Sequence, residues 1–169
     1  YRTRLLELQD GTLLMFAYVR TTHDNKVLDG IHYSIVPVPG YANICIRSTD
    51  AGQSWSGPID LDGPPHNDIE WMAAKDQRNE VTAAQTRDGS IITLARAHYS
   101  PWMWESWSED GGQTWTPTTR GPFPMYGGPQ MVCTTSGALV IGGRFPDIAV
   151  QVSHDDGMTW KCYRIDSAI

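Results

Sequence analysis

An eight-residue pattern occurs three times in the chain and constrains its fold more than any other feature. The pattern is S-x-D-x-G-x-[ST]-W, and its copies start at Ser48, Ser108 and Ser153. Repeats separated by several tens of residues indicate a stacked or radial architecture, in which each repeat is one supersecondary unit.

Each copy has the chemistry of a tight turn. An Asp side chain can accept backbone N–H groups that follow it, and a Gly supplies a position with positive φ. The hydroxyl of the Ser or Thr can lock the same turn, and the Trp can bury its ring beneath it. The pattern therefore predicts a β-hairpin that serves the fold and does not by itself perform chemistry.

A second turn signal precedes each copy, at residues 9–12, 87–90 and 135–138. Short apolar runs flank both kinds of turn, and together they predict four antiparallel strands in each repeat, which is a β-propeller blade. We therefore predict an all-β chain with blades at approximately 1–64, 65–122 and 123–169. The expected strands are 5–8, 13–19, 42–47 and 58–61, then 81–85, 91–97, 103–107 and a weak one after Trp115, and finally 131–134, 139–143, 148–152 and 161–165.

Composition excludes several function classes. The net charge of −6 argues against a nucleic-acid partner, and no run of 18 apolar residues predicts a membrane span. Cys45, Cys133 and Cys162 lack the spacing of metal ligands, so we expect buried free thiols. The chain has no zinc-ligand set and no nucleotide-binding glycine loop, so we expect no metal and no cofactor.

Charged residues are predicted to gather at one end of the blades. In an up-and-down blade, the repeated pattern and the second turn lie at the same end. The opposite end carries the start of the first strand, the end of the second strand and the loop that follows. Five charged residues fall there: Arg2, Asp24, Glu80, Arg96 and Arg144.

The repeated pattern resembles the Asp-box, or BNR repeat, of sialidases (neuraminidases) and related β-propellers. Sialidase propellers have six blades, so the resemblance implies that about three of six are present. We therefore expect the chain to be part of a longer protein, or copies to assemble into a ring. The opening Tyr1-Arg2 with the later Gly11-Thr12-Leu13-Leu14 is similar to the opening of that family.

The resemblance implies roles for the five charged residues. Arg2, Arg96 and Arg144 match three arginines that hold the carboxylate of sialic acid, Asp24 matches the acid/base, and Glu80 matches the partner of the nucleophile. Arg4 competes with Arg2 for its role, and Asp29 competes with Asp24.

The implied activity is exo-hydrolysis of terminal sialic acid from glycoconjugates with retention of configuration. The nucleophile of this family is a Tyr in a later blade, outside these 169 residues, so we expect the isolated chain to be inactive. The implied partners are a sialylated or other acidic glycan and the remaining blades. Because sialoglycans are mostly outside the cytoplasm, we expect a secreted or periplasmic protein.

Two other functions fit parts of the sequence. A polysaccharide lyase on a similar propeller also needs arginines, and His98 or Tyr99 could serve as its base. A non-catalytic Asp-box propeller that binds a protein or a glycan is the other alternative. Trp102 and Trp104 lie near the same loop, where they could stack on sugars or pack beneath it. We interpret residues 127–129, Gly-Gly-Pro, as a turn.

Overall fold

The structure is a computed structural model that describes residues 3–21, 40–61, 79–97, 100–144 and 147–165. Within these ranges the chain forms twelve β-strands and no helix, so none of the described segments could cross a membrane as a helix. The strands form three four-stranded sheets in which every neighbouring pair is antiparallel and follows chain order. The predicted all-β class and the four-stranded antiparallel blades are confirmed.

The sheets follow one another along the chain. The first contains β1 (Thr3–Glu7), β2 (Leu13–Thr21), β3 (Gly40–Ser48) and β4 (Ser56–Asp60). The second contains β5 (Val81–Gln85), β6 (Ile91–Arg96), β7 (Trp102–Ser108) and β8 (Thr119–Pro124). The third contains β9 (Tyr126–Cys133), β10 (Leu139–Arg144), β11 (Ile148–Ser153) and β12 (Lys161–Arg164).

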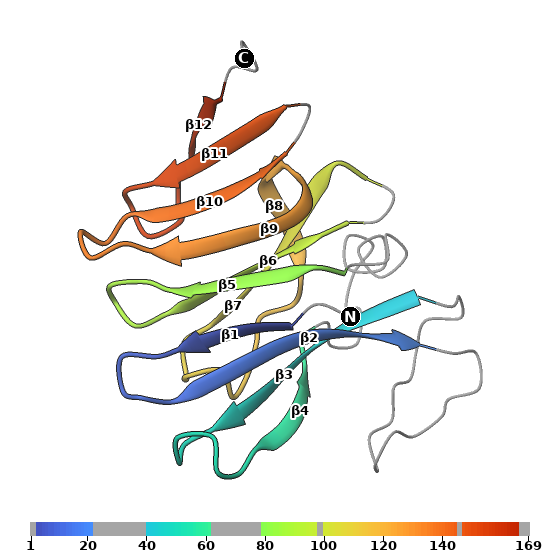
Figure 1. Ribbon diagram of the computed structural model, residues 1–169, viewed down its shortest axis with the longest axis vertical. Coiled ribbons are helices and arrows are strands. Elements are labelled where there is room, and N and C mark those ends of the chain that lie inside the picture. The colour runs from blue at the N-terminus through green and yellow to red at the C-terminus, as the bar shows by residue number, and fades with distance from the viewer. Residues whose placement is uncertain (1–2, 22–39, 62–78, 98–99, 145–146, 166–169) are drawn as a thin grey trace.

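The three sheets are stacked side by side in chain order, with the first strands β1, β5 and β9 next to one another (Figure 1). The turns that join β1 to β2, β5 to β6 and β9 to β10 lie at the left of this view, as do the Asp-boxes. The ends of β2, β6 and β10 therefore lie at the opposite end. This arrangement matches the two ends that the sequence predicts.

Two apolar cores lie between the sheets. One joins the first sheet to the second through Leu14, Phe16 and Ile91, and the other joins the second to the third through Ile92 and Ile141. Neighbouring residues of β6 thus enter different cores, because successive side chains of a strand point to opposite faces. The middle sheet is covered on both faces, which explains the nearly continuous apolar run of β6.

The three Asp-boxes have the same internal structure. In each box the Ser hydroxyl accepts a hydrogen bond from the Gly N–H at 2.9 Å. The Asp carboxylate accepts from the N–H and the hydroxyl of the following Ser or Thr, as Asp155 does from Thr159. The Trp indole N–H then donates to the carbonyl of the Gly. The predicted hairpin is confirmed in all three copies.

The boxes also join each sheet to the one before it. The Trp115 ring packs edge-on against Phe16 at a centroid distance of 5.8 Å, and Trp160 packs against Phe123 at 5.2 Å. Trp55 belongs to the first sheet, has no preceding sheet within the described residues, and is 40% exposed. The expected burial of the Trp ring is therefore wrong for the first box.

Polar contacts repeat the same connection between sheets. The Arg47 guanidinium donates to the Gly111 carbonyl at 3.0 Å, so the first sheet holds the second box. Arg87 forms an ion pair with Asp156 at 3.0 Å, so the second sheet holds the third box. The second and third boxes are therefore fixed both by their own turns and by the sheet that precedes each of them.

Several predicted strand boundaries and two of the three thiols differ from expectation. β8 is a full strand that ends at Pro124, beyond the approximate blade boundary at 122; two prolines and a Gly had weakened its signal. β9 starts at Tyr126 rather than at 131. All three cysteines are free, but only Cys45 is buried, and burial raises the pKa of its thiol to about 12. Cys162 is exposed because no described residues cover β12.

Candidate functional site

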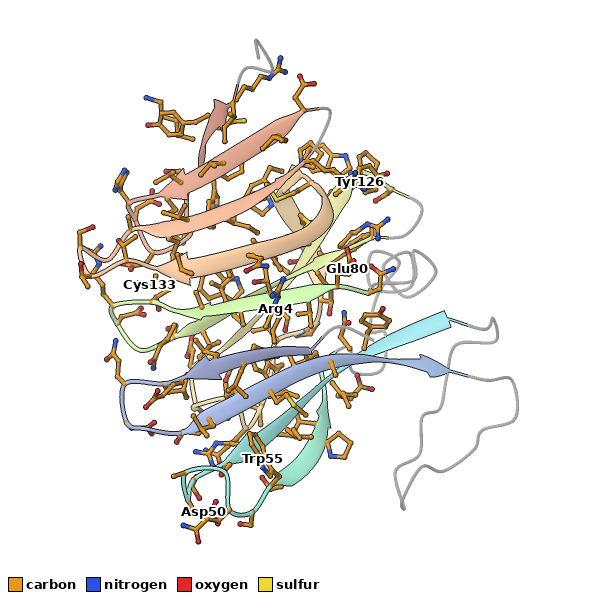
Figure 2. All side chains as sticks on the ribbon, viewed as in Figure 1. Arg4, Asp50, Trp55, Glu80, Tyr126 and Cys133 are labelled. Atoms are coloured by element: carbon orange, nitrogen blue, oxygen red, sulfur yellow. The ribbon has the colours of Figure 1, made fainter. Side chains whose placement is uncertain are left out.

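The described candidate residues lie at the end of the molecule opposite the Asp-boxes. Glu80 directly precedes β5, Arg96 is the last residue of β6, and Arg144 is the last residue of β10. Figure 2 shows Glu80 near the right-hand ends of the strands and Asp50 of the first box at the lower left. Two adjacent sheets thus bring a carboxylate and two guanidinium groups to one end.

The other predicted site residues lie outside the described residues. These are Arg2, Asp24 and the alternative Asp29. His98 and Tyr99, on which the lyase alternative depended, also lie there. The three-arginine clamp and the acid/base Asp therefore stay predictions.

Glu80 and Arg96 form an ion pair. Arg96 Nη1 lies 3.3 Å from Glu80 Oε2, and the two side chains are 26% and 16% exposed. The backbone holds the same two residues together, because the Arg96 N–H donates to the Glu80 carbonyl at 3.2 Å. The pair is half-buried at the junction of two strands, so its geometry is set by the sheet as well as by the charges.

A bulge in β9 completes the surroundings of Glu80. The Gly128 N–H donates to Glu80 Oε2 at 2.8 Å, across the gap between the second and third sheets. Gly127 and Gly128 have φ values of 75° and 58°, in the left-handed region that suits glycine. The register between β9 and β10 shifts here, so residues 127–129, interpreted above as a turn, belong to a bulged strand; the prediction of a turn is wrong.

The same bulge contacts both arginines. The Arg96 guanidinium carbon lies 5.4 Å from the centroid of the Tyr126 ring. Arg96 Nε is buried and has no hydrogen-bond partner within the described residues. The cation–π contact with the Tyr126 ring is a favourable interaction of the same guanidinium. The Arg144 side chain lies against Gly127: a Cβ added there would be 2.4 Å from Arg144 Nε.

Arg4 contacts residues of β9 that follow the two glycines of the bulge. Its Nη2 donates to the Pro129 carbonyl at 3.3 Å. With the Gln130 amide oxygen turned toward it, Arg4 also donates to that oxygen at 3.1 and 3.3 Å. In Figure 2, Arg4 lies over the middle of β5, whereas Glu80 and Tyr126 lie near the right-hand ends of the strands. These contacts indicate that Arg4 connects β1 to β9.

The two tryptophans near this end have different environments. Trp104 is buried, in contact with Ala97, so it packs beneath the surface. Trp102 is 36% exposed, and the Arg120 guanidinium lies 5.6 Å from the centroid of its ring. Of these two tryptophans, Trp102 keeps the possibility of stacking on a sugar. No group of metal ligands occurs among the described side chains.

The sequence missed the role of the bulge, although a signal was present. Two adjacent glycines follow Tyr126 directly, and glycine within a strand often marks a bulge or a close approach of another chain segment. That pattern favours a bulge as well as a turn. What the sequence could not show is which side chains approach the two glycines, because Glu80 comes from another sheet.

Known proteins share the architecture. The model of the BNR repeat-like domain family matches residues 2–167. A curated sialidase of Paraclostridium sordellii is 28% identical over 137 residues, which cover 70% of this chain and 32% of that protein. The chain thus spans about a third of the length of that relative.

Solved structures of sialidases have a similar fold. The Hadza microbial sialidase Hz136 has a TM-score of 0.65 and 18% identity over 95% of this chain and 36% of its own. A variant of the NanB sialidase from Streptococcus pneumoniae has a TM-score of 0.61 and 16% identity over 96% of this chain and 23% of its own. These identities show a common fold, that of the sialidase β-propellers. The chain therefore belongs to the BNR repeat-like domain family, with the Asp-box β-propeller fold of sialidases.

Proposed function

We propose that the chain is part of a sialidase-like glycoside hydrolase that removes terminal sialic acid from glycoconjugates. One observation carries the proposal: Glu80, Arg96 and Arg144 come from two adjacent sheets to one end, and all three contact the same bulge of β9. The sialidases to which the chain is similar support the same chemistry.

The arginines would hold the substrate. A sialoside carries a carboxylate on its anomeric carbon, and guanidinium groups bind carboxylates through charge-assisted, often bidentate hydrogen bonds. Arg96 and Arg144 lie at this end of the sheets, and Arg2 would be the third member of the clamp. Arg144 is exposed, so it can reach a ligand from solvent.

Glu80 would activate the nucleophile. A carboxylate nucleophile would be repelled by the carboxylate of the substrate, and sialidases use a Tyr instead. The Tyr would come from a blade outside this chain. Its phenol oxygen would bond to the anomeric carbon while the glycosidic bond breaks; Glu80 would take the phenol proton, and Asp24 would protonate the leaving oxygen. Water would then attack the anomeric carbon while the bond to the Tyr oxygen breaks. Asp24 would accept a proton from the water, and Glu80 would return its proton to the phenolate.

A binding experiment on the 169-residue chain tests the substrate half of this proposal. N-acetylneuraminic acid is titrated into the labelled chain and followed by NMR, with its methyl ester as the uncharged control. We expect shifts around Glu80, Arg96 and Arg144 with the acid and weaker binding of the ester. Arg144→Ala should weaken binding of the acid about tenfold, as expected for a charge-assisted hydrogen bond.

The matched control is Lys161→Ala, which removes an exposed cation from the start of β12, at the Asp-box end. It should bind the acid as the unaltered chain does. Equal binding of acid and ester, or shifts confined to the Asp-box end, would refute the proposal. A fluorogenic sialoside gives the second test, because the isolated chain, without the Tyr, should show no turnover.

A further inference from the structure

The bulge formed by Tyr126, Gly127 and Gly128 contacts Glu80, Arg96 and Arg144. Each of its residues has a separate contact: the Tyr126 ring lies beneath Arg96, the Gly127 backbone lies against Arg144, and the Gly128 N–H donates to Glu80. We propose that this bulge, here called the β9 bulge, is the positioning element of the site. Its effect on ligand binding rests on the proposed function.

Tyr126 would orient Arg96. The guanidinium is tied to Glu80 through Nη1 and rests on the ring, while its buried Nε lacks a hydrogen-bond partner within the described residues. An ion pair alone fixes one nitrogen and leaves the plane of the guanidinium free to turn. The ring face defines that plane, so it determines the direction in which the remaining N–H groups point.

Gly127 would make room for Arg144. Any side chain at this position would overlap the Arg144 stem, because the added Cβ would be 2.4 Å from Nε and 2.9 Å from Cγ. The tyrosine before it pairs with Arg144 across β9 and β10. The bulge therefore lets Arg144 pass directly over the backbone beside the residue that supports Arg96.

Gly128 would fix the carboxylate. Its N–H and Arg96 Nη1 both donate to the same oxygen, Glu80 Oε2. Two donors on one oxygen limit rotation of the carboxylate plane. Because the donors come from β9 and β6, any displacement of the third sheet relative to the second would move Glu80 away from its position.

The first part of the test needs no ligand. The Arg96 Nε–H and Gly128 N–H signals are compared by NMR in the unaltered chain, Tyr126→Phe, Tyr126→Ala and Glu80→Gln. We expect the chemical shift of Arg96 Nε–H to stay the same in Tyr126→Phe. In Tyr126→Ala it should lose the ring-current contribution of the tyrosine. Glu80→Gln should shift the Gly128 signal, because its acceptor loses its charge. An unchanged Arg96 signal in Tyr126→Ala, or an unchanged Gly128 signal in Glu80→Gln, would overturn the proposal.

The second part measures affinity for N-acetylneuraminic acid. Tyr126→Ala should weaken binding about two- to fivefold, the range of a cation–π contact, and Tyr126→Phe should restore it. Gly127→Ala should weaken binding, whereas Gly142→Ala should not, because a Cβ at Gly142 would meet nothing within 4 Å. An equal loss in both Tyr126 variants, or none in Gly127→Ala, would overturn the proposal.

The two proposals fail in different ways. If the unaltered chain binds no sialic acid, the proposed function fails, and the Arg96 and Gly128 signals alone decide the role of the β9 bulge. If Tyr126→Ala does not fold, the Glu80→Gln and Gly127→Ala variants still test two of the three contacts. Urea unfolding of each variant separates loss of the site from loss of the fold.

Discussion

At the Asp-box end each of the three sheets repeats the same turn, whereas at the opposite end the second and third sheets contribute different residues. The Gly N–H to Ser hydroxyl bond is 2.9 Å long in every box and spans four residues. The bonds to Glu80 span 16 residues from Arg96 and 48 residues from Gly128. Each turn at the Asp-box end is thus closed by local bonds, whereas the surroundings of Glu80 depend on how the second and third sheets are placed.

If the proposed function holds, stability and ligand binding depend on different ends of the molecule. The repeated end contains the turns and the ring contacts between sheets. The other end contains the Glu80–Arg96 ion pair, and a partly exposed ion pair contributes little to stability. Substitutions at the two ends should therefore differ in kind, with large losses of stability at one end and large losses of binding at the other.

The largest effect on stability should come from Trp160→Ala. The ring is half-buried against Phe123, and its removal should cost about 3 kcal/mol of unfolding free energy, the lower end for large aromatic residues. Trp55→Ala is the matched control in the first box, where the ring is 40% exposed, and should cost under about 1 kcal/mol. Urea unfolding measures both. Equal losses would show that the box Trp acts within its own turn and not between sheets.

Gly112→Ala should have the next largest effect. Its φ is 84°, and a Cβ would lie 2.9 Å from the Leu14 side chain of the preceding sheet. Gly11→Ala has the same φ of 84° but meets nothing within 4 Å. We expect about 1 kcal/mol for Gly11→Ala from backbone strain, and roughly 1–2 kcal/mol more for Gly112→Ala from overpacking. Identical unfolding midpoints would contradict close packing of the second box on the first sheet.

Glu80→Gln should change stability little. The pair with Arg96 is partly exposed, and the Gln amide oxygen can still accept from Gly128, so the loss should be about 1 kcal/mol. Binding of N-acetylneuraminic acid to the variant is the second measurement. An unfolding free energy that drops by several kcal/mol would mean that this end also supports the fold, and the contrast between the ends would be lost.

Acid should lower the unfolding free energy by protonating carboxylates at the Asp-box end, and this effect should be absent at neutral pH. The Ser54 hydroxyl that donates to Asp50 lowers the pKa of that carboxyl to about 2, and Thr159 does the same for Asp155. Because the folded pKa is below the ordinary value of 3.8, the stabilisation is present above that value and is lost as the pH falls toward 2. Urea midpoints between pH 5 and pH 2 measure it. The double variant Asp50→Asn and Asp155→Asn should show a flatter pH profile; an unchanged profile would contradict this origin.

The sequence was sufficient to predict most of the scaffold. The strands flank turns whose chemistry is readable in a few residues, and the alternation of strands places the ends of β6 and β10 opposite the boxes. It indicated only a weak strand after Trp115, because prolines and a glycine hide the full extent of β8, which the neighbouring β7 holds in place. It failed at Cys162 and Trp55, whose burial depends on contacts from another sheet.

The candidate site was predictable only in part. Glu80, Arg96 and Arg144 could be assigned to one end from strand direction, but their roles stay predictions. The β9 bulge could not be identified as part of the site, because its three contacts come from residues distant in sequence. A pattern of charges indicates where a site is, whereas the groups that orient those charges become visible only in three dimensions.

The contacts of the second and third boxes with the preceding sheet follow the order of the chain. Phe16 and Arg47 precede the second box in the chain, and Arg87 and Phe123 precede the third. As a ribosome releases the chain from its N-terminus, each receiving surface is therefore synthesised before the box that will occupy it. Removing the last sheet leaves the earlier boxes with their contacts, whereas removing the first exposes Trp115, so shortening the chain from its two ends should have unequal consequences.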